Sequence, residues 1–182
     1  DPIFHGFKKN NQKCLYLSSE FDVGLETLSN IYNEIYFSGN NETKQIIDTR
    51  LKFSEKENII LSSELNKIFE KKETFDLIYS QNLIKFLENT NIKKNNIHEF
   101  FEKIFNSINI NGCFCFGLKF NELLENFNDE IPITKNTTKE VQLEEVKKMI
   151  VSKGFKVDIY WVLPSIEKPY YSSNMLNEIP LI

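Results

Sequence analysis

Several residue types are scarce in this 182-residue chain, and some of these scarcities exclude a class of protein. Alanine is absent and Arg50 is the only arginine, a bias that we attribute to an AT-rich genome and not to function. Three cysteines are too few for the disulfide framework of a small secreted domain. No run of about 18 apolar residues is present, so we expect no membrane-spanning helix, and no signal peptide is recognisable.

The cysteines also argue against a metal site. Cys113 and Cys115 lie two residues apart in a predicted strand, so their side chains should share one face of the sheet. The only histidines that could complete a metal site are His5 and His98. We therefore expect buried, reduced thiols and an intracellular, reducing compartment. This would be the cytoplasm, or an organelle if a presequence before Asp1 has been removed.

Net charge and hydrophobic content limit which partners and which domain organisation are expected. The net charge is −4, which argues against a nucleic-acid surface because phosphate binding needs concentrated positive charge. Hydrophobic residues make up 41% of the chain, with 16 phenylalanines, which is enough for one sizeable core. We predict one domain over residues 1–182, with a core at about 13–163 and a polar, aromatic tail at 164–182.

Apolar runs and helical patterns alternate along the core. A strand pattern followed by a helical pattern, repeated several times, predicts a mostly parallel, doubly wound α/β sheet with helices on both faces, a Rossmann-like architecture. Strands buried on both faces should read as continuous apolar runs, as Leu77-Ile78-Tyr79 and Phe114-Cys115-Phe116 do. The predicted strands cover residues 13–17, 34–37, 58–61, 75–80, 112–117 and 155–163.

One helix has a particularly clear pattern. Its apolar residues recur at helical spacing from Ile97 to Ile108 and define a single face that should pack on the sheet. Asn96 and Glu99 have the spacing of a capping box at its start, and Asn111-Gly112 is the expected end. A second capping box, at Thr137 and Glu140, should start a later helix that ends at Gly154.

The stretch Phe75-Asp76-Leu77-Ile78-Tyr79-Ser80, followed by a helix and then by Asn109-Ile110-Asn111-Gly112-Cys113-Phe114, resembles class I S-adenosylmethionine-dependent methyltransferases. That family has a similar strand, then a helix ending near Pro-Gly-Gly, then a bulky apolar strand. Gly154-Phe155 is similar to the Gly-Phe pair that enters a late strand of the family. The resemblance covers about residues 13–163. It implies S-adenosylmethionine as cofactor, bound where the strands end.

The resemblance also implies which residues would line the cofactor crevice. The family's first loop is rich in glycine, whereas here Leu17 to Gly24 contains Gly24 alone. The second strand of the family ends in an acidic residue that holds the ribose, whereas here Ser38-Gly39-Asn40-Asn41 stands in that place. The implied cofactor-binding residues are Ser18, Glu20, Gly24, Asn40, Glu64, Ser80 and Gln81. No catalytic residue and no metal ligand is identified.

Two functions remain open. Because the first loop has lost its glycines, we expect a methyltransferase-like domain that no longer catalyses and instead serves as a protein-interaction or structural subunit. The alternative is an active, divergent methyltransferase that acts on a small molecule, a protein or RNA. Aromatic residues gather near the C-terminus, at 160–164 and 169–171. They either pack in the core or, if exposed, offer anchors for a protein partner.

Overall fold

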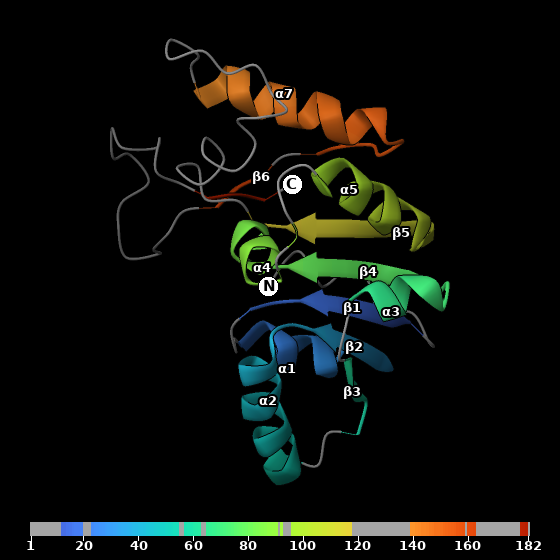
Figure 1. Cartoon of the computed structure of the whole chain (residues 1–182), viewed down its shortest axis with the longest axis vertical. Coiled ribbons are helices and arrows are strands. Elements are labelled where there is room, and N and C mark those ends of the chain that lie inside the picture. The colour runs from blue at the N-terminus through green and yellow to red at the C-terminus, as the bar shows by residue number, and fades with distance from the viewer. Residues whose placement is uncertain are drawn as a thin grey trace.

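The computed structural model describes residues 12–19, 23–54, 57–62, 65–90, 92, 96–117, 139–158, 160–162 and 179–181. Its centre is a sheet of five strands, all parallel, in the spatial order β3-β2-β1-β4-β5 (Figure 1). The strands are β1 (Lys13–Leu17), β2 (Glu34–Ser38), β3 (Ile59–Ser62), β4 (Phe75–Ser80) and β5 (Ile108–Phe116). The predicted parallel, doubly wound sheet is therefore confirmed.

Helices cover both faces of this sheet. The helices are α1 (Val23–Ser29), α2 (Asn41–Ser54), α3 (Leu65–Glu70), α4 (Leu83–Asn89), α5 (Ile97–Asn106) and α7 (Lys139–Ser152). Buried residues of α1 and α2, such as Leu28 and Ile47, form one apolar cluster with side chains of β1, β2 and β4. Buried residues of α3, α4, α5 and α7 form a second cluster with side chains of β1, β4 and β5. The two clusters lie on opposite sides of the sheet because successive strand residues point to opposite faces.

Strand β5 shows this alternation directly. Cys113 and Cys115 pack against the α1/α2 cluster, whereas Phe114 and Phe116 pack against the other cluster. The prediction that the two thiols share a face is confirmed. The rings of Phe114 and Phe116 lie 4.6 Å apart between centroids and continue onto Phe101 of α5. The predicted apolar face thus packs on the sheet from Ile97 to Ile104, whereas Phe105 is exposed and Ile108 belongs to β5.

The predicted ends of α5 are wrong in two details. The helix ends at Asn106, with Ser107 as C-cap, and not at Asn111-Gly112. Asn111 lies inside β5 with a φ of 66°, close to a register shift between β4 and β5. Asn111-Gly112 therefore marks an irregularity within a strand and not the end of a helix. At the other end, Asn96 is the N-cap but its side chain makes no capping hydrogen bond. Glu99 forms an ion pair with Lys103 instead, at 2.7 Å.

The last predicted strand is also corrected. Residues 155–158 follow Gly154 without forming a strand, and β6 covers only Tyr160–Val162. Phe155 and Val157 are half-buried against the core while Lys156 and Asp158 are exposed, so the segment alternates like a strand but has no strand pairing. β6 pairs antiparallel with β7 (Ile179–Leu181) in a separate two-stranded sheet. Neither β7 nor the short helix α4 was predicted.

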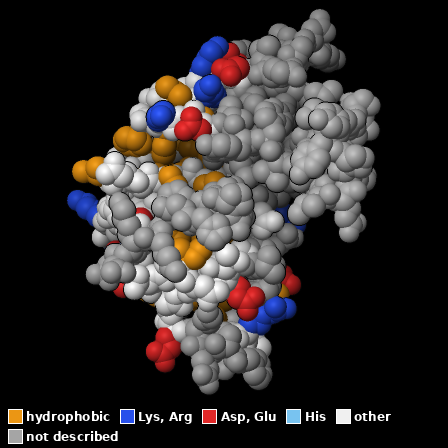
Figure 2. All heavy atoms as spheres, turned by 180° about the vertical axis from the view of Figure 1, so that it is seen from behind, with side chains coloured by type: hydrophobic (Ala, Val, Ile, Leu, Met, Phe, Trp, Pro, Cys, Tyr) orange, Lys and Arg blue, Asp and Glu red, His pale blue; other side chains and the backbone are white. Residues whose placement is uncertain are grey.

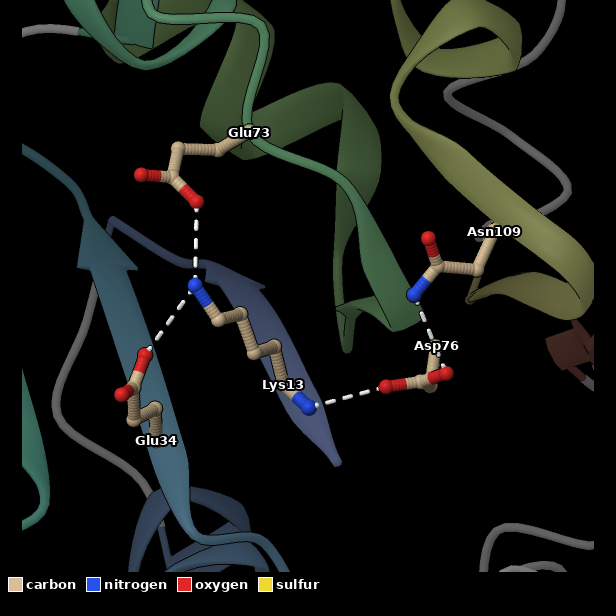
Figure 3. A network of polar contacts seen from close by, with 5 residues as sticks. All are labelled: Lys13, Glu34, Glu73, Asp76 and Asn109. Carbon is tan, nitrogen blue, oxygen red and sulfur yellow. Dashed lines mark hydrogen bonds and ion pairs between the residues drawn. The ribbon is translucent and has the colours of Figure 1, made fainter. Parts of the chain in front are cut away.

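A polar network joins the amino ends of the strands (Figure 3). The ammonium group of Lys13 lies 3.1 Å from a carboxylate oxygen of Glu73 and 3.3 Å from one of Glu34. The hydrogen bond to Glu73 is the main reason why the pKa of Lys13 is raised. Asp76 accepts hydrogen bonds from the backbone N–H of Lys13, at 2.9 Å, and from the amide of Asn109, at 3.1 Å. This network ties four strands together at the edge opposite the predicted cofactor site.

Candidate functional site

The predicted site lies at the carboxyl edge of the sheet, toward which the arrowheads in Figure 1 point. In the order β3-β2-β1-β4-β5 the direction of winding reverses between β1 and β4. Ligands of open α/β sheets bind outside the carboxyl ends of the strands at such a switch point. Ser18 follows β1 directly and Ser80 is the last residue of β4, so the fold brings these two predicted residues to the switch point.

Serine residues end three of the five parallel strands here, namely β2, β3 and β4. Ser38 of β2 is in register with Leu17 of β1 and with Ser62 of β3. Ser80 of β4 is in register with Phe116 of β5, and one step back Tyr16 is in register with Tyr79. Because residues in register on parallel strands point to the same face, these serine side chains lie on the Leu17 side of the sheet. The edge therefore presents small hydroxyl groups.

Ser80 is the unusual member of this row. It is fully buried, and its side-chain oxygen has no hydrogen-bond partner within the described part of the chain. Its backbone is satisfied, since its carbonyl accepts the N–H of Gly117 at 2.9 Å. Buried hydroxyl groups are normally hydrogen-bonded, because an unmade bond costs about 1–3 kcal/mol. An orphaned hydroxyl at a switch point is a group that a ligand could satisfy.

The loops after β1 and β2 are bound tightly to each other. The N–H of Ser18 donates to the carbonyl of Ser38 at 3.1 Å. The carbonyl of Ser19 accepts the hydroxyl of Thr43 at 2.7 Å and the amide of Asn40 at 3.4 Å. Gly39 is required at this contact, because a Cβ there would lie 2.2 Å from the carbonyl oxygen of Ser18. The two loops thus meet backbone to backbone.

Asn40, the predicted ribose-binding residue, serves as the N-terminal cap of α2. Its side-chain oxygen accepts the N–H of Thr43 at 2.8 Å, three residues on, while its amide group donates to Ser19. This is the usual role of asparagine before the first turn of a helix. Both ends of the carboxamide are therefore engaged within the protein.

The remaining predicted cofactor-binding residues do not form one site within the described residues. Gly24 lies in the first turn of α1, so it is not part of a loop. Gln81 is exposed just after β4, beside Asn82, whose side chain caps α4. Glu20 and Glu64 lie outside the described residues, and so do the aromatic residues at 169–171. The side chains of 160–162 are likewise not described, so the choice between core packing and an exposed interface for them stays open.

Sequence reasoning missed three residues that shape this edge, namely Ser19, Gly39 and Thr43. A usable signal was present only for the helix cap, because asparagine is a favoured residue before the first turn of a helix, where it accepts a backbone N–H from that turn. The close approach at Gly39 had no such signal, because Ser18 and Gly39 are distant in sequence and meet only through the pairing of β1 and β2.

The described residues that end the strands carry no ionisable group. Serine, asparagine and glutamine can donate and accept hydrogen bonds, but they cannot act as general acid or base near neutral pH. Among the described residues, no group of three histidine, cysteine or acidic side chains could hold a metal ion. No helix in the described ranges is long and apolar enough to cross a membrane. The edge can orient a neutral or zwitterionic ligand by hydrogen bonds.

No protein-family model matches the chain, and no curated protein matches its sequence. Solved structures do match its fold. Methanococcus jannaschii fibrillarin, a pre-rRNA processing protein, is 20% identical with a TM-score of 0.60, over 95% of this chain and 66% of its own. A precorrin 8W decarboxylase from Methanobacterium thermoautotrophicum is 12% identical with a TM-score of 0.61, over 98% of this chain and 83% of its own.

A putative methyltransferase solved in complex with SAH also matches, at 11% identity and a TM-score of 0.54. The match covers 93% of this chain and 44% of that one, so the chain spans well under the full length of some of its structural neighbours. Identities this low establish the fold alone. The five parallel strands, their order and these neighbours together show that the chain has the Rossmann-like fold of class I S-adenosylmethionine-dependent methyltransferases.

Proposed function

We propose that this chain is a methyltransferase-fold domain that does not catalyse methyl transfer and acts as a protein-interaction or structural subunit. The observation that carries the proposal is that the side chain of Asn40 is hydrogen-bonded within the protein. Where the resemblance places an acidic ribose ligand, this side chain caps α2 and donates to Ser19. A ribose bound there would compete with both hydrogen bonds, and it would find no carboxylate to strengthen its own.

The loop contact supports the same proposal. In the family the glycine-rich first loop allows the cofactor to approach the backbone closely. Here Gly24 has become part of α1, and the chain after β1 is held to the chain after β2 by four hydrogen-bonded or backbone contacts around Ser19 and Gly39. Opening this contact to admit a cofactor would break hydrogen bonds worth about 1 kcal/mol each.

A specific observation favours the alternative, an active divergent methyltransferase. The orphaned hydroxyl of Ser80 sits at the switch point, where an amino or carboxylate group of a bound cofactor could satisfy it. One structural neighbour was solved with SAH, and another is described as a pre-rRNA processing protein. RNA is therefore a substrate to test beside proteins and small molecules if the cofactor binds.

Calorimetric titration with S-adenosylmethionine and with SAH separates the two functions. We expect no measurable heat at about millimolar ligand, which corresponds to less than about 4 kcal/mol of binding free energy. Micromolar binding that Ser80→Ala weakens about tenfold or more would instead support the enzyme and overturn the proposal. Ser80→Ala is a clean probe, because removal of a buried, unpaired hydroxyl should not destabilise the fold. Circular dichroism of the variant checks that it is folded.

A further inference from the structure

Exposed hydrophobic side chains concentrate on one part of the molecule. The large apolar residues that are clearly exposed within the described ranges are Ile46, Ile60, Phe105, Ile110 and Val151. Three of them, Phe105, Ile110 and Val151, belong to the end of α5, the start of β5 and the end of α7. Ile110 is 95% exposed, an extreme value for a side chain in a strand. A group of exposed apolar side chains marks an interaction surface more often than a single exposed apolar residue does.

Contacts between α5 and the chain after α7 hold this surface together. The rings of Phe105 and Phe155 meet edge to face, 5.0 Å apart between centroids. Gly154, with a φ of 99°, lies so close that a Cβ there would be 2.8 Å from the Phe105 ring. The N–H of Gly154 in turn donates to the carbonyl of Val151 at 2.9 Å. Phe105 and Phe155 are thus held together beside Gly154, which follows Val151 by three residues, and Ile110 lies in the first residues of β5, which follows α5 directly.

The surface has charges of both signs at its margin. Glu102 precedes Phe105 by one helical turn, and Lys153, Lys156 and Asp158 flank Phe155 along the chain. None of these four forms an ion pair within the part of the chain that the structure describes. Nearby charges are already paired within their own helices, as in Lys103–Glu99 and Lys148–Glu145. The ends of α5 and α7 lie on the right in Figure 1 and therefore on the left in Figure 2, which is seen from behind. On that side, Figure 2 shows hydrophobic side chains interleaved with lysine and acidic ones.

We propose that this surface, defined by Phe105, Ile110, Val151 and Phe155, binds a second copy of the chain in a two-fold symmetric dimer. A two-fold interface uses the same surface twice, so it must be self-complementary. Charges of both signs, here two acids and two lysines that form no ion pair among the described residues, are compatible with that requirement, because a lysine of one copy can face an acid of the other. A surface of one sign would instead repel its own copy. The inference does not depend on whether a cofactor binds.

Sedimentation velocity over about 1–100 µM protein tests the proposal, because a dimer populates with concentration. We expect the wild type to approach the mass of two chains at the upper end. Ile110→Lys and Val151→Lys should each raise the dissociation constant at least about tenfold. Both side chains are exposed, so folding should survive. The matched control is Ile46→Lys on α2, since Ile46 is 45% exposed and Val151 is 48% exposed. This control should dimerise like the wild type.

Charge reversal gives a second, independent measurement. The pair Lys153→Glu and Lys156→Glu should weaken the dimer by like-charge contact, and adding Glu102→Lys and Asp158→Lys should restore it. A wild type that stays monomeric over the whole concentration range would overturn the proposal. So would a dimer that Ile46→Lys disrupts as strongly as Val151→Lys does, because the interface would then lie elsewhere. Failure of cofactor binding would leave both outcomes unchanged.

Discussion

At the scale of single residues, burial decides the chemistry of the thiols. Cys113 and Cys115 point into the cluster that packs α1 and α2 on the sheet. Burial raises the pKa of Cys113 from 9.0 to about 11 and that of Cys115 to about 12. Cys14 is fully buried, and its pKa is raised well above the ordinary value for the same reason. These thiols stay neutral near pH 7, which makes them packing groups and poor nucleophiles.

These raised pKa values predict how stability depends on pH. Below pH 9 the thiols are neutral in both the folded and unfolded states, and they do not affect the pH dependence. Between pH 9 and about 11 the unfolded chain loses the protons that the folded chain keeps, so unfolding becomes more favourable as pH rises. From pH 8 to 10 the wild type should lose about 2–3 kcal/mol more free energy of unfolding than the double variant Cys113→Ala/Cys115→Ala.

Urea unfolding of both proteins at the two pH values measures this difference. Tyrosine and lysine titrations are largely common to wild type and variant and cancel in the comparison, except that Cys113 and Cys115 contribute to the raised pKa of Tyr32 after the larger effect of its own burial. Equal losses of stability in the two proteins would contradict the burial of the thiols. Reaction of the folded protein with a thiol reagent at pH 8 should be correspondingly slow and should accelerate on unfolding.

At the scale of elements, asparagine side chains at helix starts differ in what they do. Asn82 accepts the N–H of Lys85 at 3.1 Å and so caps α4. Asn40 caps α2 in the same way and also holds the loop after β1. Asn96 stands at the start of α5 without a side-chain capping bond. The same residue type at the same helical position thus has a different energetic role in each helix.

Two matched substitutions test this distinction. Asn82→Ala should lower the free energy of unfolding by about 1 kcal/mol, since it leaves a backbone N–H of the first turn without its acceptor. Asn96→Ala should change it by less than about 0.5 kcal/mol, because it removes no capping bond. Thermal or urea denaturation of the two variants gives the comparison. An equal cost for both would show that Asn96 caps α5 in solution.

At the scale of the whole molecule, Asp76 links the amino ends of β1, β4 and β5. Asp76→Ala would leave the N–H of Lys13 and the amide of Asn109 without their acceptor. We expect a loss of about 1–3 kcal/mol in the free energy of unfolding. Glu34→Ala removes an ion pair whose two side chains are 35% and 45% exposed, and it should cost less than about 1 kcal/mol.

Chemical denaturation measures both substitutions, and added salt separates them further. The effect of Glu34→Ala should shrink at about 1 M salt, because exposed charges are then screened, while that of Asp76→Ala should largely persist. If Glu34→Ala proved as costly as Asp76→Ala, the ion pair and not the backbone link would hold this edge together.

Much of the fold could be predicted from the local spacing of apolar residues, because this spacing reflects which side chains each strand or helix buries. The apolar runs at residues 13–17, 34–37, 58–61 and 75–80 each coincide with an observed strand to within one or two residues. The spacing from Ile97 onward predicted the face of α5 that packs on the sheet. The errors occurred where the pairing of strands, and not the local sequence, decides whether a segment forms a strand. Asn111-Gly112 reads as a helix end but lies in β5, and Phe155 to Asp158 alternates like a strand but finds no partner.

The sequence alone determined the alternation of strands and helices, and with it a parallel sheet whose strands all end at one edge, because side-chain periodicity and helix caps act over a few residues. Only the tertiary structure decided what that edge contains. Gly39 meets Ser18, Asn40 donates to Ser19, and the hydroxyl of Ser80 finds no hydrogen-bond partner among the described residues, because β1, β2 and β4 come together from distant parts of the chain. Such contacts depend on strand order and register, which no local pattern encodes.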